Sequence, residues 1–343
     1  HGIELYLAAE DTDNLKKEFG DYPNIIYVPL KYSNKFVRLG YEIPRIIKER
    51  QIDFAHFNYY LPLFLNKKCK YIVTIHDVLF LDYPEYFPKT YYLKNKWLFR
   101  HAAKRAEVLT SVSEYAAASI KRNFKLSDKP IPVLPNAVDT DFNIENNKNT
   151  SKHYIEEKYG IRNFFVYVSR IEPRKNHISV LKMYEELELW KRDIEVVFIG
   201  KMAIENKEFD DTLKRLIKKS NSKVHHLSNI NFNDLKSFYN AALVAFFPSL
   251  CEGFGIPPLE SAILKTPTIC SNLTAMKEFN FFEPYHIDPR DEEAFKVSVL
   301  SILDEIKLGE NEERLSHISK EIKEKYDWKK TSEILAQTIN NTL

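Results

Sequence analysis

Cationic side chains cluster where the apolar run Phe164–Val168 is expected to end. Arg170, Arg174 and Lys175 lie in the loop that follows, and a helix is predicted to begin near Lys175. The N–H groups of a helix N-terminus attract anions. Cations beside such a terminus suit a diphosphate. A solvated basic loop is the alternative, and it would be the commoner interpretation of this loop taken alone.

Two carboxylates flank a glycine-containing segment after the predicted strand at residues 242–247. Glu252 precedes Gly253-Phe254-Gly255, and Glu260 follows Pro257-Pro258. Prolines suit a helix start because a missing N–H costs nothing there. Glycines let the backbone approach a ligand, and carboxylates accept hydrogen bonds from sugar and ribose hydroxyls. This pattern favours a sugar- or nucleotide-binding loop over a capping glutamate beside a simple turn.

A third polar position ends the predicted strand at residues 71–76, where His76 precedes Asp77. A lone histidine is more often a core residue than a catalyst. A histidine at a strand end and next to an aspartate slightly favours a functional role.

The elements that must position these residues are short β-rich runs alternating with amphipathic stretches. The predicted strands lie at residues 3–8, 25–30, 52–57, 71–76, 107–112, 131–134, 164–169, 194–199, 224–227, 242–247 and 267–270. One predicted helix carries Val180, Met183, Tyr184, Leu187 and Trp190 on a single face. Such alternation predicts an α/β fold with parallel sheets, whose ligands bind beyond the carboxyl ends of the strands.

The segment Phe142–Lys152 has no apolar periodicity and is predicted to be a linker between two Rossmann-like domains that face a cleft. The first domain is predicted at residues 1–145 and the second at residues 151–326. A terminal helix at residues 327–343 is expected to complete the first domain.

The bulk composition excludes several classes of protein. The 343 residues carry a net charge of +2, without the basic surplus of a nucleic-acid binder. The three cysteines, Cys69, Cys251 and Cys270, fit neither a zinc site nor a disulfide framework. They are expected to be thiols in the cytoplasm. No apolar run approaches the roughly 20 residues that cross a bilayer.

These motifs resemble glycosyltransferase family 4, whose members are retaining enzymes of the GT-B fold. Glu252 and Glu260 are separated by seven residues, as in the family's E-x7-E motif. Four further segments match family motifs in chain order: Thr74–Asp77, Ser111–Glu114, Val133–Asp139 and Tyr167–Asn176. The chain departs from the family at Ser169, where glycine is commoner.

The resemblance implies a role for each matching residue. Arg170 and Lys175 would bind the donor diphosphate, and Glu260 would bind the ribose. Glu252 would lie near the donor sugar, in a pocket lined by the Gly253, Phe254 and Gly255 backbone. His76 would lie near the reacting carbon. No metal or other cofactor would be needed, because the cations neutralise the leaving diphosphate.

The expected activity is transfer of a hexose, with mannose from GDP-mannose as first choice, to a glycan or lipid-linked acceptor in cell-surface polysaccharide synthesis. The alternatives are an inactive sugar-nucleotide-binding partner subunit and a nucleotide-sugar epimerase. No nucleic-acid partner is expected. The basic, aromatic segment Tyr91–Arg105 could contact the inner face of the membrane. An ordinary surface helix that packs on the sheet is the favoured interpretation.

The chain opens almost directly on the strand predicted at residues 3–8, without the strand, glycine-containing turn and helix that start a Rossmann half. The natural polypeptide is therefore expected to carry roughly 30 or more residues upstream, the size of a strand–helix unit.

Overall fold

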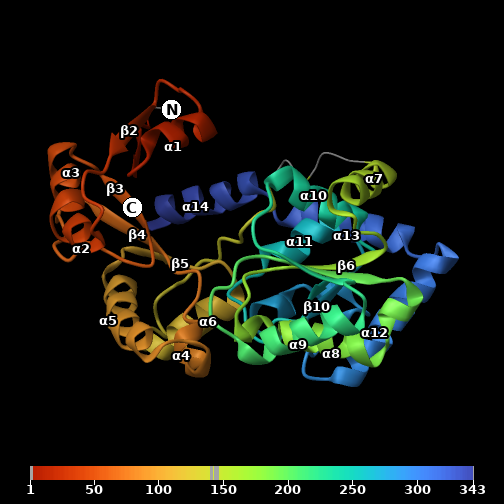
Figure 1. The fold of residues 1–343 in the computed structure, drawn as a ribbon. Helices are drawn as coiled ribbons and strands as arrows, with labels where there is room; N and C mark the ends of the chain where they lie inside the picture. The colour runs from red at the N-terminus through yellow and green to blue at the C-terminus, as the bar shows by residue number, and fades with distance from the viewer. Residues whose placement is uncertain (1–2, 140–141, 143–146, 343) are drawn as a thin grey trace. The chain divides into compact units, whose positions relative to one another are not determined.

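The computed structural model describes residues 3–139, 142 and 147–342 (Figure 1). The chain forms two compact units, His1–Ile75 with Lys94–Leu109 and His76–Leu93 with Thr110–Leu343. These units do not test where the two predicted domains begin and end. The division predicted between residues 145 and 151 therefore stays a prediction.

The first unit contains two small sheets. Its elements are β1 (Leu5–Ala9), α1 (Thr12–Phe19), β2 (Ile25–Pro29), α2 (Lys35–Val37), the π-helix η1 (Arg38–Glu42), α3 (Ile43–Glu49), β3 (Phe54–Asn58), β4 (Lys70–Thr74), most of α5 (Lys89–Arg105) and most of β5 (Val108–Thr110). The sheet orders are β1-β2 and β3-β4-β5. Among the described strands β1 pairs only with β2, and the predicted upstream segment stays a prediction.

The second unit is built on one six-stranded sheet of order β11-β10-β9-β6-β7-β8. Its strands are β6 (Phe164–Val168), β7 (Glu195–Ile199), β8 (Val224–Leu227), β9 (Val244–Phe247), β10 (Thr268–Ser271) and β11 (His286–Ile287). Each neighbouring pair in this sheet runs parallel. The parallel sheet predicted for this half of the chain is therefore confirmed.

Helices cover both faces of this sheet. The helices of the second unit are α4 (Leu79–Asp82), η2 (Pro84–Tyr86), α6 (Glu114–Phe124), α7 (Lys148–Tyr159), η4 (Pro173–Lys175), α8 (His177–Glu186), η5 (Leu189–Arg192), α9 (Lys207–Lys219), α10 (Phe232–Ala241), α11 (Ile256–Ile263), η6 (Thr274–Glu278), η7 (Asn280–Phe282), α12 (Glu292–Leu308), α13 (Glu312–Lys325) and α14 (Trp328–Thr342). In Figure 1, α8, α9 and α12 lie on one face, with α10, α11 and α13 on the other.

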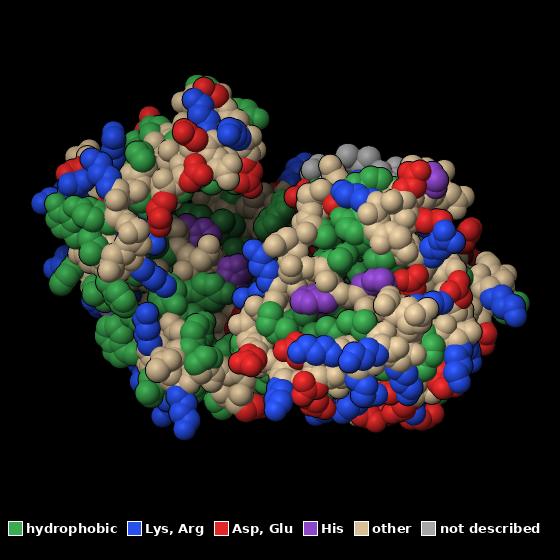
Figure 2. Space-filling view, in the orientation of Figure 1, with side chains coloured by type: hydrophobic (Ala, Val, Ile, Leu, Met, Phe, Trp, Pro, Cys, Tyr) green, Lys and Arg blue, Asp and Glu red, His purple; other side chains and the backbone are tan. Residues whose placement is uncertain are grey.

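Burial on both faces explains why the strands are apolar. All four residues of β9 are buried, as are the first four of β6. The covering helices are amphipathic instead: α9 buries Phe209, Leu213 and Leu216. Figure 2 shows Lys, Arg, Asp and Glu side chains over α8, α9 and α12, where the polar faces of such helices meet solvent.

Two predicted elements differ from the structure. The run predicted as a strand at residues 131–134 forms no strand and contributes only an isolated bridge between Ser111 and Val133. The helical face predicted to reach Trp190 is interrupted, because α8 ends at Glu186 and Glu188 takes a left-handed φ of 46°. Trp190 lies in the separate helix η5, although it still packs against the core.

The predicted linker is also only partly right. Residues 143–146 lie outside the described residues, but α7 already begins at Lys148, where Asn147 caps it. Phe142 is buried and contacts the rings of Phe232 and Tyr239, with centroids 5.0 and 6.2 Å away. Aromatic packing on α10 therefore anchors Phe142, a contact that the polar composition around it did not indicate.

Candidate functional site

The segment between β9 and α11 has the strand–loop–helix form that its sequence predicts. Pro257 and Pro258 lie in the first turn of α11, where their missing N–H groups leave no helical hydrogen bond unmade. Gly255 adopts a φ of 111°, and a Cβ there would lie 3.0 Å from Met276 Cγ. Glycine suits this position because side-chain-bearing residues rarely adopt this backbone angle, and a Cβ would also press on the Met276 side chain.

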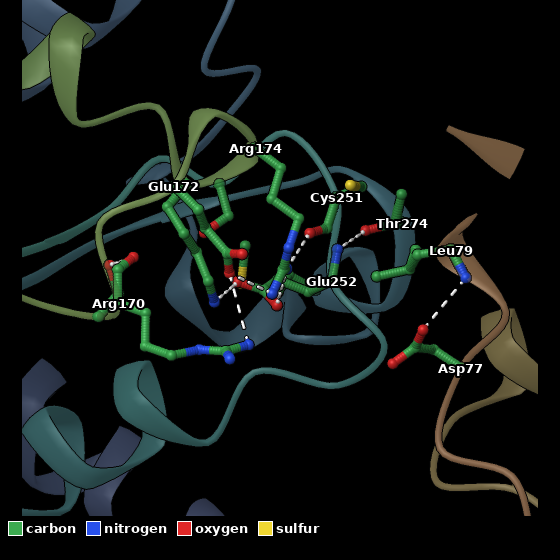
Figure 3. Close-up of polar contacts among 12 residues, drawn as sticks. Asp77, Leu79, Arg170, Glu172, Arg174, Cys251, Glu252 and Thr274 are labelled. Carbon is green, nitrogen blue, oxygen red and sulfur yellow. Dashed lines mark hydrogen bonds and ion pairs between the residues drawn. The ribbon is translucent and has the colours of Figure 1, made fainter. Parts of the chain in front are cut away.

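A cluster of buried ion pairs joins this segment to the end of β6. Each oxygen of the Glu252 carboxylate has a cation: Lys175 Nζ contacts Oε1, and Arg174 Nη1 lies 2.9 Å from Oε2 (Figure 3). The Arg174 guanidinium also donates to Glu172 Oε1 at 2.6 Å and to the Cys251 carbonyl at 2.9 Å. Since β6 and β9 are neighbours in the sheet, their carboxyl ends bring these residues together.

The cluster keeps Glu252 ionised. Burial alone would raise the pKa of Glu252, but the charges of Lys175 and Arg174 outweigh it and lower that pKa to about 2. Burial would likewise lower the pKa of Arg174, and the charges of Glu252 and Glu172 raise it instead. Glu252 is therefore a carboxylate, and an acceptor of hydrogen bonds, throughout the physiological range.

The two predicted diphosphate ligands differ in exposure. The Arg170 side chain is 66% exposed and lies 3.7 Å from Glu172 in a loose ion pair. Lys175 is 13% exposed and is paired with Glu252. Lys175 and Glu252 line a small pocket with Tyr167, Ser169, Ser249 and Gly255. Both cations lie in the loop predicted for them, but only Lys175 is part of this pocket.

Glu260 lies on α11 and not among the residues that line this pocket. It accepts a hydrogen bond of 3.1 Å from the Tyr239 hydroxyl. Burial raises the pKa of Glu260 to about 7, and the charge of Asp139 acts in the same direction. Within the described part of the chain Glu260, unlike Glu252, pairs with no cation, and its charge state changes near neutral pH.

His76 and Asp77 pack against the loop that contains Gly253. His76 and Gly253 are 177 residues apart in the sequence. A Cβ on Gly253 would lie 2.6 Å from Asp77 Cβ and 3.0 Å from the His76 carbonyl oxygen. Burial lowers the pKa of His76, so its imidazole is neutral at pH 7. Asp77 accepts a hydrogen bond from the Leu79 N–H at 3.1 Å.

Ser169 has a local role at the position where the family commonly has glycine. Its hydroxyl lies 2.9 Å from Nε2 of the buried His177, whose pKa burial lowers to about 3. The glycine in this region is instead Gly200, at the end of β7. A Cβ there would lie 2.0 Å from the Ser169 carbonyl oxygen, so the ends of β6 and β7 are in close contact.

Three residues of the site are missing from the sequence-based assignment of roles. Arg174 is the buried centre of the cluster, Glu172 is its second acid, and Tyr239 is the partner of Glu260. In the sequence Glu172 lies between Arg170 and Arg174, and this order could have predicted an ion pair. Tyr239 gave no signal, because α10 places it beside Glu260 only in the folded chain.

The described residues hold neither a metal-binding cluster nor a membrane-spanning helix. No group of three or more His, Cys, Asp or Glu side chains within the described ranges could hold a metal ion. No helix in the described part of the chain is both long and apolar enough to span a membrane. The prediction that the reaction needs no metal is not tested by the first result and stays a prediction.

Two family profiles match nearly the whole chain. The profile for glycosyl transferases group 1 matches residues 149–323, and the profile for glycosyltransferase family 4 matches residues 1–142. The chain belongs to the glycosyl transferases of group 1. It is therefore a sugar-transferring enzyme, as the resemblance predicted. The group 1 match contains Arg170, Lys175, Glu252 and Glu260, whereas His76 falls in the family 4 match.

This glycosyltransferase is similar to the O-antigen chain mannosyltransferase RfbU of Salmonella typhimurium. The two are 25% identical over an alignment 318 residues long, which covers 83% of this chain and 83% of the other. A glycosyltransferase structure from Rickettsia africae gives a TM-score of 0.73 at 16% identity, covering 98% of this chain and 91% of that one. Anabaena HepE in complex with UDP and glucose gives 0.71 at 13% identity, with 98% and 91% covered. The fold is GT-B, as predicted.

Proposed function

We propose that this glycosyltransferase moves mannose from GDP-mannose to a glycan or lipid-linked acceptor in the synthesis of a cell-surface polysaccharide, with retention of anomeric configuration. The observation that carries the proposal is the buried contact of Glu252 with Lys175 and Arg174 beyond neighbouring strands β6 and β9. The similarity to the Salmonella O-antigen chain mannosyltransferase supports mannose as the sugar and cell-surface polysaccharide synthesis as the pathway class.

Arg170 and Lys175 are proposed to bind the donor diphosphate. Both lie in the loop between β6 and α8, close to the N-terminus of α8, whose dipole also favours negative charge. Negative charge grows on the leaving diphosphate as the glycosidic bond breaks, and fixed cations stabilise that charge most in the transition state. On this proposal the enzyme needs no metal or cofactor, because these groups supply the positive charge.

The remaining site residues are proposed to hold the donor sugar and the ribose. Glu252 would accept hydrogen bonds from sugar hydroxyls, and the Gly253, Phe254 and Gly255 backbone would lie along the sugar. Glu260 would accept from the ribose hydroxyls. The neutral imidazole of His76 would lie near the reacting carbon. A protonated imidazole there would repel the positive charge that develops on the sugar ring, and burial lowers the pKa of His76.

Retention is proposed to follow from attack on the front face of the sugar. The acceptor hydroxyl oxygen forms a bond to the anomeric carbon on the face from which the diphosphate oxygen departs. The leaving phosphate takes the proton of that hydroxyl, so no protein base is consumed. Two electrons leave with the diphosphate, and the acceptor oxygen supplies two to the new bond.

The donor is tested by thermal-shift screening against GDP-mannose, UDP-glucose and other nucleotide sugars, because a ligand that binds the native state raises its apparent stability. GDP-mannose is expected to give the largest shift. A larger shift with a UDP-sugar would reject guanine and mannose as the base and sugar of the donor. The assignment as a glycosyltransferase would be unaffected. Mannose transfer to a lipid-linked or glycan acceptor, followed by mass spectrometry, then tests the reaction.

The same assay separates the two alternative activities. An epimerase would release free nucleotide from the donor with no acceptor present. An inactive partner subunit would bind the donor without any turnover. Transfer of the sugar to an added acceptor contradicts both.

Contact with the inner face of the membrane is proposed to involve α5. This helix contains six Lys or Arg residues and no Asp or Glu. One side of it is packed as the favoured sequence interpretation expects, with Phe99, Ala102 and Ala103 buried. Leu93 and Trp97 are on another side, 71% and 59% exposed. Basic residues beside an exposed tryptophan suit a surface of anionic lipids.

Sedimentation with vesicles tests this contact. The protein is expected to bind phosphatidylglycerol vesicles and not phosphatidylcholine vesicles, and Trp97→Ser with Leu93→Ser is expected to reduce the bound fraction. Trp328→Ser is the matched control, because Trp328 is also an exposed tryptophan, at 52%, on α14. Equal binding of the α5 variant and the wild type would reject α5 as the contact.

A further inference from the structure

Arg174 is the most enclosed cation of the site, and the roles proposed above do not use it. Its side chain is 11% exposed, while that of Arg170 is 66% exposed. Three of its hydrogen bonds go to Glu252 Oε2, the Cys251 carbonyl and Glu172 Oε1, at 2.9, 2.9 and 2.6 Å. The guanidinium is thus held between the two acids of the cluster.

Lys175 and Arg174 share Glu252, but they face different surroundings. Lys175 contacts Oε1 and lines the pocket, whereas Arg174 contacts Oε2 and is not among the residues that line it. A ligand in this pocket therefore meets Lys175 directly and reaches Arg174 only through Glu252. Figure 3 shows Arg174 between Glu172 and Glu252.

The chemistry of the two side chains fits different tasks. A lysine ammonium is a compact charge on a flexible stem and can change partners. An arginine fork is planar and binds two acceptors at fixed geometry. If Lys175 turns to an anionic ligand, Glu252 loses one of its two cations. A buried carboxylate left without any cation would be strongly destabilised, so the second cation decides whether Lys175 can leave.

We propose that Arg174 is a positioning residue that holds Glu252 while Lys175 exchanges this carboxylate for the diphosphate of a nucleotide. The exchange is non-covalent: one ion pair of Lys175 is broken, another is formed, and the Arg174–Glu252 pair persists. The inference rests on the proposed function for the identity of the ligand. Arg174 itself touches no part of the nucleotide.

The test is a double-mutant cycle on binding of GDP and UDP, measured by calorimetry. These ligands carry the diphosphate but no donor sugar, so Glu252→Gln removes no sugar contact. Arg174→Gln is expected to weaken binding about tenfold or more, because Lys175 becomes the single cation on Glu252 and is held there. Glu252→Gln in the same chain releases Lys175 and is expected to restore most of the affinity.

Several outcomes would overturn the proposal. One is a double variant, Arg174→Gln with Glu252→Gln, that binds GDP and UDP as weakly as the single variant Arg174→Gln. In that case Arg174 either contacts the phosphate directly or is needed for the fold. If Arg174→Gln does not fold by circular dichroism, Arg174→Lys replaces it in the cycle, since one ammonium cannot bridge both acids. The same loss and the same rescue are then expected, and their absence contradicts the proposal.

Arg314→Gln is the matched control. Arg314 is also a partly buried arginine of the second unit, paired with Glu305 and placed over the Tyr285 ring at 4.8 Å. Its removal is expected to leave GDP and UDP binding unchanged, and an equal loss would point to a general effect of charge. A wild-type protein that binds neither nucleotide would reject the proposed function. Binding in the wild type without rescue in the double variant rejects the role of Arg174 alone.

Discussion

The Ser113 hydroxyl, at the start of α6, donates a hydrogen bond of 2.7 Å to the carbonyl oxygen of Gly253. Ser113 also caps α6 by accepting from the Ala116 N–H at 3.1 Å. The other side of Gly253 is occupied by the His76–Asp77 segment. Gly253 is therefore enclosed by two segments that lie far from it in the sequence, and its environment has no room for a side chain.

Gly253→Ala is expected to destabilise the protein by about 1–3 kcal/mol, the usual cost of overpacking. Its Cβ would lie 2.6 Å from Asp77 Cβ, so either the loop or the Asp77 backbone must shift. Turnover is expected to fall as well, because the shift moves the neighbouring Glu252. Thermal unfolding and a transfer assay measure the two effects.

Gly40→Ala is the control for this substitution, because a Cβ on Gly40 meets nothing within 4 Å. Its melting temperature and turnover are expected to match the wild type or to rise slightly, since alanine is favoured over glycine in helices. If Gly253→Ala behaves like Gly40→Ala, the loop is less closely packed than its geometry indicates.

Glu260→Ala is expected to weaken nucleotide binding by about 1.5–3 kcal/mol, the range for a hydrogen bond to a charged group. The loss should concern the ribose, so a nucleotide without ribose hydroxyls should bind the variant and the wild type alike. Calorimetry with GDP and its dideoxy analogue measures both. Unchanged GDP affinity in Glu260→Ala would remove the ribose role.

Nucleotide affinity is expected to rise between pH 6 and pH 8, because the pKa of Glu260 is about 7 and the ionised carboxylate is the better acceptor. Glu260→Gln should abolish this dependence. Tyr239→Phe should move the midpoint to higher pH, since the Tyr239 hydrogen bond lowers the pKa of Glu260. A pH-independent affinity in the wild type would contradict the assignment.

The same carboxyl group makes a prediction for stability. Its pKa in the folded protein, about 7, is above the model-compound value of 4.5, so the folded state holds the proton more tightly than the unfolded state. This group therefore lowers the free energy of unfolding as pH rises from about 4.5 to 7, and adds no further change above pH 7. Glu260→Gln should melt at a higher temperature than the wild type at pH 8, and the difference should shrink at pH 5.

Replacing Arg170 or Lys175 by glutamine is expected to reduce turnover more than affinity for the nucleoside. Charge builds up on the diphosphate in the transition state, whereas the nucleoside carries none. Single-turnover rates beside guanosine binding give the comparison. Equal losses in both quantities would show that the two cations serve binding only.

The product is expected to retain the donor's anomeric configuration, and transfer is expected to survive EDTA. Both follow from front-face attack with Arg170 and Lys175 in place of a metal. The anomeric coupling in the NMR spectrum of the product reports the first, and the rate with and without chelator reports the second. An inverted product, or a rate abolished by EDTA, would reject the mechanism.

The sequence by itself determined the elements whose signals are local. The apolar run at β6 was predicted to within one residue of its ends, because a strand buried on both faces needs apolar side chains throughout. The start of α11 was predicted from Pro257 and Pro258, because proline fits only the first turn of a helix. Glu252 and Glu260 were predicted from their place after a strand and around glycines.

The tertiary structure alone decided how these residues meet. Strands β6 and β9 are neighbours although two strands lie between them in the chain, and this order pairs Lys175 with Glu252. It also buries Arg174 between two acids and sets Tyr239 beside Glu260. Local periodicity states which side of an element faces the core, but not which element lies opposite. Ion pairs and pKa values depend on which element lies opposite, because electrostatic interactions act through space and not along the chain.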